Sequence, residues 1–301
     1  MQAQQSTAKA AAWMAGWLTL MLVIAVAGRE ATRELAVFQV MELRSVIGLF
    51  LLWPMVRSAG GFATLKTQRA RDHAMRNLAH YAAQYAWFAA LTMIPLAQVV
   101  AIEFTMPVWI ILLAAAFLGE RITTWKVLAV ALGLCGVGLI VRPGGSGLSP
   151  GQLVALAAAL GFAVSVTMVK SLTRTDSALA IMVWMLVLQS LLGLLPALWV
   201  WRWPSATAWG WVGVVAFCGT FSHYCMARAM VHADATVVMP MDYLRVPLTA
   251  LAGWLIYAER LDVFTVAGTV LILAGNLLNI RRAGSAQRPT SGSHRPSAGD
   301  R

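Results

Sequence analysis

Apolar blocks of about 20 residues, separated by short polar stretches, occupy nearly the whole chain. A helix of that length crosses the ~30 Å hydrocarbon layer of a bilayer, and in lipid the backbone polar groups must be satisfied within the segment. Glycine, proline and charged residues mark the breaks between blocks. The pattern predicts ten membrane-spanning helices, near residues 10–28, 36–57, 75–94, 96–118, 124–142, 150–170, 178–200, 208–231, 236–258 and 263–280.

The composition agrees with an all-α membrane protein. Of the 301 residues, 59% are hydrophobic and 12% are charged, whereas a soluble domain carries about 25% charged residues. The net charge of +11 does not indicate nucleic-acid binding, because Lys and Arg are confined mainly to short connections and tails. Cys135, Cys218 and Cys225 lie inside apolar blocks without metal-ligand spacing. We therefore expect free thiols, no metal site and no cofactor.

Positive charge is distributed unequally between the two sides of the predicted helices. With the N-terminus in the cytoplasm, the inside segments hold 15 Lys and Arg residues and the outside segments hold 5. This excess predicts a multi-pass protein of a bacterial inner membrane with both termini cytoplasmic. Residues 1–9 would form an N-terminal tail, and residues 281–301, rich in Ser, Gly, Pro and Arg, a disordered cytoplasmic tail.

The chain contains an internal repeat. An offset of 139 residues aligns Gln84 to Arg142 with the second half without gaps and places Glu103 on Asp242, Gln84 on His223 and Glu120-Arg121 on Glu259-Arg260. The predicted units are repeats at 10–142 and 150–280, joined by a linker at 143–149. Five spans per repeat is an odd number, so the second repeat would be inverted, a recurring design of transporters.

The first apolar block has an alternative interpretation as a signal peptide. Lys9 precedes it, and Ala25-Val26-Ala27 resembles a cleavage site. Its removal would leave the first repeat one helix short, so the membrane-helix interpretation is preferred.

The segments Leu118-Gly119-Glu120-Arg121 and Leu132-Gly133-Leu134-Cys135-Gly136, with Pro107 before them, resemble the EamA domain of the drug/metabolite transporter superfamily. The second half repeats the pattern with Pro247, Glu259-Arg260 and Gly275. Arg44 also resembles the arginine of the second helix of these domains. The resemblance implies a ten-helix secondary transporter with a central cavity. The second copy departs from the pattern at Ala258, which replaces a glycine, and at Gln189, where an arginine is expected.

Six charged residues fall inside the predicted spans, where ionisable groups are costly and tend to face a partner or a solute path. They are Glu42, Arg44, Glu103, Arg228, Asp242 and Arg245. We predict two charged clusters on opposite sides of the midplane, each part of a gate. Asp242 and Arg245 would pair within one helix, and Arg44 would find a partner such as Glu103. The alternative is that these ion pairs only hold helices together.

Uncharged polar and aromatic residues extend the candidate substrate-binding or gating site. The full set is Arg44, Gln84, Tyr85, Glu103, Gln189, His223, Tyr224, Asp242, Tyr243 and Arg245. The candidates for carrying a coupling proton are Glu42, His80, Glu103, His223 and Asp242. Packing or structural hydrogen bonding is the alternative for the aromatic residues and histidines, and His73 is interpreted as an ordinary loop or interface residue.

Helix packing and hairpin closure explain two further groups. Gly133, Gly136, Gly138, Gly268 and Gly275 predict close contacts of the helices at 124–142 and 263–280. Glu120-Arg121 and Glu259-Arg260 are expected to hold tight turns by capping or ion pairing.

The predicted function is secondary active transport of a small organic metabolite, first of all export of amino acids or related polar solutes. Uptake of a vitamin or nucleoside-like metabolite is the alternative. A membrane-embedded enzyme is a third possibility, with His80, Gln84 and Glu103 as its nearest candidates, but no metal or phosphate-loop motif supports it. The expected partners are the substrate, the lipid bilayer and, as a candidate, a proton, but no nucleic acid. The chain is expected to be a monomer or homodimer.

Overall fold

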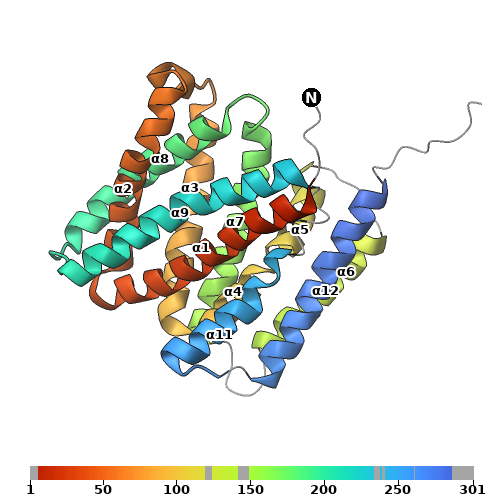
Figure 1. Ribbon diagram of the computed structural model, residues 1–301. Coiled ribbons are helices and arrows are strands. Elements are labelled where there is room, and N and C mark those ends of the chain that lie inside the picture. Colours follow the sequence, from red (N-terminus) through yellow and green to blue (C-terminus); the bar gives the residue numbers. More distant parts are fainter. Residues whose placement is uncertain are drawn as a thin grey trace, which may run out of the picture.

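The computed structural model describes residues 6–118, 124–141, 149–233, 238, 241–260 and 262–286, and this part of the chain is helical without strands. Long helices follow one another along the chain and are linked by short connections (Figure 1). Their bounds are α1 (Thr7–Glu34), α2 (Val37–Ser58), η1 (Gly61–Leu65), α3 (Ala70–Met93), α4 (Leu96–Glu103), α5 (Met106–Leu118), α6 (Thr124–Val141), α7 (Pro150–Leu172), α8 (Ala178–Trp199), α9 (Ala206–His232), α11 (Arg245–Tyr257) and α12 (Val263–Ala286).

Serine caps begin several of these helices where the sequence changes from polar to apolar. Ser177 and Ser205 each accept a hydrogen bond from the backbone N–H three residues on, and Ser149 forms a full capping box with Gln152. Such caps satisfy amide groups that have no partner inside the helix. They define the starts of α7, α8 and α9.

Five segments are long and apolar enough to cross a membrane: Thr7–Glu34, Val37–Ser58, Leu96–Leu113, Pro150–Val169 and Ala178–Trp199. The helices α3 and α9 are of similar length but are not among them. Both carry several polar side chains, among them His73, Asn77 and Gln84 on α3 and Ser222 on α9, and these four are buried or nearly so. Polar residues that face other helices lower the apolarity of a segment without exposing those residues to lipid.

Two of the predicted spans are broken in the middle. Phe104 and Thr105 separate α4 from α5, and a turn at Tyr243-Leu244 precedes α11. These positions are related by the 139-residue offset. Each break precedes a proline in the first turn of the next helix, Pro107 or Pro247. A proline ring clashes with the carbonyl four residues before it, so it is accommodated best in the first turn of a helix. The continuous helices expected at 96–118 and 236–258 are therefore wrong in this detail.

Helices of the first half pack mainly against helices of the second. The contacting pairs are α1 with α9, α2 with α8, α3 with α7, α4 with α11, and α6 with α12. If each span is replaced by its counterpart in the other half, the set of pairs is unchanged. The pair α1–α9 becomes α7–α3, and the other three pairs become themselves. This is the contact pattern of two repeats related by a pseudo-two-fold axis.

The pair of α6 and α12 lies at one edge of the molecule (Figure 1). The pair is held by close backbone approach, because a Cβ atom on Gly136 would lie 2.5 Å from the carbonyl oxygen of Gly268, and a Cβ on Gly268 equally close to that of Gly136. The predicted packing role of these two glycines is confirmed.

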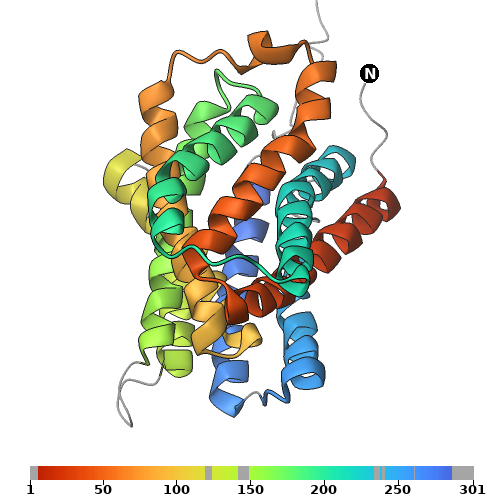
Figure 2. The ribbon, with the colours of Figure 1, turned by 90° about the vertical axis from the view of Figure 1, so that its left-hand side faces the viewer.

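The molecule has two ends, here called the Ser6 face and the Leu35 face after the two limits of α1. At the Ser6 face, α1 begins beside the end of α9, since the Ser6 amide donates to the His232 carbonyl at 2.9 Å. The η1 connection between α2 and α3 lies at the same end, at the top of Figure 2. The α1–α2, α3–α4 and α11–α12 connections lie at the Leu35 face.

Large apolar side chains are exposed around the outside. Phe50, Leu195, Trp199 and Val263 are each more than 70% accessible. A soluble monomer rarely leaves so much apolar surface open. In a bilayer, these residues contact lipid.

Candidate functional site

A buried ion cluster lies where the two broken spans meet. Arg245, the first residue of α11, contacts Glu103, the last residue of α4, at 2.8 Å and Asp242 at 3.4 Å. The helix breaks place all three groups together, because each ends or begins a half-helix. One guanidinium thus serves two carboxylates, and the cluster carries a formal charge of −1.

Each carboxylate also receives an indole hydrogen bond from a different helix. The Trp17 Nε1–H of α1 donates to Asp242 at 2.6 Å, and the Trp87 Nε1–H of α3 donates to Glu103 at 2.9 Å. The Arg245 guanidinium lies 4.8 Å from the centre of the Phe104 ring, a cation–π distance. Four spans therefore converge on this cluster.

The pairing of Asp242 with Arg245 is confirmed, but the pairing of Glu103 with Arg44 is wrong. Glu103 and Asp242 also share one cluster and are not separated into two. The prediction of two clusters placed each charged residue at a depth in the membrane, calculated for continuous helices that rise ~1.5 Å per residue. The breaks invalidate that assumption, since they bring Arg245 against the end of α4.

A second polar group lies between α2, α3 and α8. Arg44 donates from Nη2 to the Gln189 Oε1 at 2.9 Å, so these two positions, which correspond in the two repeats, contact each other. Glycines make room for the charged groups. A Cβ on Gly193 would lie 2.7 Å from Glu42 Oε2 and 2.9 Å from the Tyr81 hydroxyl, and one on Gly219 would lie 3.0 Å from Arg44 Nη1.

Several buried polar atoms of this group have no hydrogen-bond partner in the part of the chain that the structure describes. They are Arg44 Nε, Tyr81 Oη, Gln84 Oε1 and Gln189 Nε2, and Glu42 and Ser190 of the same group face each other. Buried polar atoms are nearly always paired, with protein or with water. A concentration of unpaired donors and acceptors on three adjacent helices is the arrangement expected where a polar ligand or water completes the hydrogen bonds. We call these six residues the α2–α8 polar group.

The two predicted histidines each contact a neighbouring helix. The His80 Nδ1 lies 3.2 Å from the Ser165 hydroxyl of α7, and the His223 ring packs beside Trp17. The predicted enzyme grouping of His80 with Gln84 and Glu103 finds no support, because the partners of Glu103 are Arg245 and Trp87. Among the described residues, no cluster of three metal-ligating side chains is found.

The three predicted tyrosines contact different aromatic rings. Tyr85 stacks on Phe38, Tyr224 meets Trp13 edge-on, and Tyr243 meets Phe104 edge-on. Tyr85 and Tyr224 are exposed. The structure therefore does not bring this repeat-related pair together, and only Tyr243 lies beside the ion cluster.

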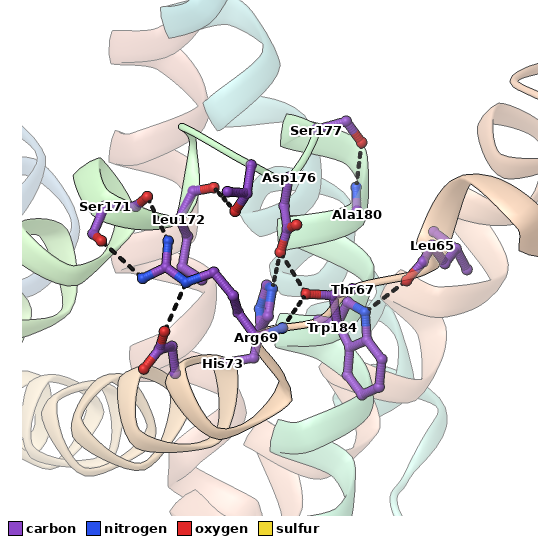
Figure 3. Close-up of polar contacts among 12 residues, drawn as sticks. Leu65, Thr67, Arg69, His73, Ser171, Leu172, Asp176, Ser177, Ala180 and Trp184 are labelled. Carbon is purple, nitrogen blue, oxygen red and sulfur yellow. Dashed lines mark hydrogen bonds and ion pairs between the residues drawn. The ribbon is translucent and has the colours of Figure 1, made fainter.

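A polar network closes the Ser6 face between the two halves (Figure 3). The His73 Nε2 of α3 lies 2.7 Å from Asp176 Oδ2, in the connection between α7 and α8, and Thr67 donates to the same oxygen at 2.8 Å. Arg69 donates to the Ser171 carbonyl at 2.7 Å and to its hydroxyl at 2.8 Å. We call these five residues the Ser6-face latch. The hydrogen bond from His73, more than any other contact, holds the pKa of Asp176 below its ordinary value.

Sequence reasoning missed the Ser6-face latch. His73 was interpreted as an ordinary loop or interface residue, but its side chain is 0% exposed. The repeat alignment begins at Gln84 and contains no signal for this contact. Its partner Asp176 lies in a short connection about a hundred residues away, so only the packing of α3 on α7 brings the two together.

A second network joins the halves at the Leu35 face. Glu259 forms an ion pair with Arg29 of α1 and accepts the backbone N–H of Leu96, at the start of α4, at 3.0 Å. Its position depends on Ala258, whose left-handed backbone (φ 54°) ends α11. The expected capping and ion pairing of Glu259 are confirmed, although they bridge α1, α4 and α11 rather than a single hairpin. We call Arg29, Leu96 and Glu259 the Leu35-face latch. Glu120 and Arg121 lie outside the described residues.

Comparison with known proteins gives matches over both halves. The profile of the EamA-like transporter family matches residues 9–142 and 149–281. A solved structure covers 94% of this chain and 100% of its own, with a TM-score of 0.64 and 20% identity, which is a likeness of fold alone.

Named bacterial relatives transport different compounds. A riboflavin transporter of Brucella anthropi is 31% identical over 81% of this chain and 87% of its own. An S-adenosylmethionine uptake transporter of Rickettsia felis is 26% identical over 88% and 91%. The pseudopaline exporter CntI of Pseudomonas aeruginosa is 30% identical over 81% and 86%.

Proposed function

Because the chain belongs to the EamA-like transporter family, we propose that it carries a small polar organic metabolite through its interior by alternating access, as a secondary transporter. It is a membrane-embedded small-molecule transporter and not an enzyme. The observation that carries the proposal is the α2–α8 polar group, whose unpaired buried atoms lie between helices of both halves. Solute binding there supplies the missing partners, which favours occupation of the site.

The two latches give the proposal its mechanism. Each joins the first half to the second, one at the Ser6 face and the other at the Leu35 face. Rocking of one half against the other would open one latch while the other stays closed. The solute would then reach the polar group from one side at a time.

The charges of the polar group favour a zwitterionic solute. Glu42 contacts α8 at Gly193, and Arg44 contacts α8 at Gln189. Gln189 and Gly193 lie one turn apart on α8. A carboxylate and a guanidinium so arranged match the ammonium and carboxylate of an amino acid. Export of amino acids or related polar solutes is therefore the first candidate.

Uptake of a vitamin or nucleoside-like metabolite is the second candidate. Relatives named for riboflavin and S-adenosylmethionine favour it. Relatives named for uptake and relatives named for export both occur, so the direction of transport rests on measurement.

Proton coupling would use the ion cluster. A single Arg245 cannot neutralise both Glu103 and Asp242, so a proton taken up by either carboxylate would remove the excess charge. Glu42, His80 and His223 are further candidates.

We place the protein in a bacterial inner membrane with ten spans in two inverted repeats, divided at 142 and 150, and with both termini cytoplasmic. The positive charge of the connections supports this orientation.

Counterflow in proteoliposomes tests the function. Vesicles loaded with one candidate solute should accumulate the same labelled solute and return it chemically unchanged. Replacing Gln189 by Leu should raise the half-saturating concentration about tenfold, because a buried charged hydrogen bond is lost. Gln98→Leu, which alters a half-buried glutamine of α4 outside the polar group, is the control. No exchange of any zwitterion, vitamin or nucleoside would refute the proposal.

A further inference from the structure

An apolar groove of about 800 Å³ runs along the outside of the molecule between α2, η1 and α8. Its size is that of a small-molecule site, typically about 300–1,000 Å³. Leu49 and Trp53 of α2 face Val187 of α8 across it, and Phe62 of η1 closes one end. Phe62 is 72% exposed. Such a surface is unfavourable in water and calls for an apolar occupant.

One end of the groove is basic. Lys66 is the one charged residue among the described residues that line it, and it follows η1 directly. Arg57 lies in the last turn of α2, before η1, and Arg69 lies after η1 at the start of α3. The polar backbone there is satisfied, since the Trp184 indole N–H donates to the Leu65 carbonyl at 2.9 Å (Figure 3). The groove thus offers hydrocarbon contact along its length and a positive charge at its end.

We propose that this groove binds one acyl chain of an anionic phospholipid, with the lipid phosphate on Lys66. Both walls belong to helices that are long and apolar enough to cross a membrane, so the groove opens towards lipid chains. Basic residues at the end of a span attract anionic headgroups. A second copy of the chain fits less well, because a two-fold contact places the same patch, with its basic connection, against itself.

The bound lipid would act on the Ser6-face latch. The groove walls come from both halves, α2 from the first and α8 from the second. Leu65 and Trp184, which line the groove, adjoin Thr67 and Asp176 of that latch (Figure 3). A chain lying in the groove packs against both halves and favours the state in which the latch is closed. Only this consequence rests on the proposed transport cycle, and the lipid site itself does not.

The test compares phosphatidylglycerol with phosphatidylcholine of the same acyl chains, added to delipidated protein in detergent. Native mass spectrometry measures the bound lipid. Phosphatidylglycerol should bind more tightly, and Lys66→Gln should weaken it about fivefold, the effect of one basic contact. Lys9→Gln, which removes an exposed charge in the first turn of α1 at the same face, should leave binding unchanged.

A second variant keeps the test independent of charge. Val187→Trp fills the groove. It should abolish the tighter binding of phosphatidylglycerol over phosphatidylcholine while transport continues. Lipids brominated in their acyl chains quench the fluorescence of nearby tryptophans. This quenching should fall when Trp53 is replaced by Phe, because Trp53 lines the groove. Equal binding of both lipids, equal loss in Lys66→Gln and Lys9→Gln, or a lipid-free dimer that occludes the groove would overturn the proposal.

Discussion

Arg245 is the one cation of the buried ion cluster that also contains Glu103 and Asp242. It is 4% exposed and balances Glu103 and Asp242 from the start of α11. A buried ion that loses its partner keeps its desolvation cost without the compensating attraction. The cluster is therefore sensitive to any change that leaves one sign of charge in excess.

Replacing Arg245 by Ala should lower the stability of the protein by about 3–5 kcal/mol, because two buried carboxylates then face each other without a cation. Thermal unfolding of the purified protein in detergent measures the loss. An unfolding temperature equal to that of the wild type would contradict the assigned pairing.

Neutralising the whole cluster separates structure from transport. A triple variant combines Glu103→Gln, Asp242→Asn and Arg245→Met. It should regain most of the stability that Arg245→Ala loses, because no charge is left unpaired. Transport should nevertheless be lost if the charges move during the cycle. Wild-type transport by this triple variant would mean that the ion pairs only hold the helices together.

Asp176 makes the Ser6-face latch sensitive to acid. Its pKa is lowered in the folded protein, chiefly by the bond to His73. The folded state therefore gains stability from this group above its unfolded pKa, and loses it as the pH falls through the lowered value. Unfolding temperatures between pH 7 and pH 3 should decline more steeply for the wild type than for Asp176→Asn. Parallel curves would contradict the assignment.

At the residue scale, the charged members of the interior could be predicted and their partners could not. Arg44, Glu103, Asp242 and Arg245 stand out because ionisable residues are rare in apolar blocks. Which of them meet depends on the helix breaks, and the sequence offers only a proline near each. His73 carried no signal, because nothing local distinguishes a buried histidine at a helix start from an exposed one.

At the element scale, the glycines of α6 and α12 decide how closely the edge pair packs. Replacing Gly136 by Ala would place a methyl group 2.5 Å from a backbone oxygen of α12 and should cost about 1–3 kcal/mol. Replacing Gly138, beside which no atom lies within 4 Å, should instead gain about 0.5–1 kcal/mol from its helix propensity. Thermal unfolding of the two variants checks the difference. Equal shifts would mean that α6 and α12 are not in backbone contact.

The helices themselves were largely predictable, because span length and apolarity follow from the bilayer. The prediction fell short where a span is interrupted, as between Glu103 and Met106. Hydrophobic periodicity does not register a break of two residues when the flanking segments are both apolar. The more polar spans α3 and α9 were also predicted, from the apolar blocks at 75–94 and 208–231.

At the scale of the whole molecule, each half completes the other. Every major helix pair joins the first repeat to the second, and the two latches lie at opposite faces. This arrangement could be expected from the repeat, which predicts symmetry-related contacts. The Ser6-face latch could not, since none of its residues lies in the repeat alignment. Of the Leu35-face latch, the alignment singles out Glu259 but gives no sign of its partner Arg29.

The central claim is that the halves rock and open one latch at a time. Locking each latch in turn tests it most directly, with a reducible thiol cross-linker on a variant without native cysteines. Arg69→Cys with Ser171→Cys locks the Ser6-face latch, and Arg29→Cys with Glu259→Cys locks the Leu35-face latch. Either cross-link should stop solute exchange in proteoliposomes, and reduction should restore it. Undiminished exchange with both faces locked would contradict this claim.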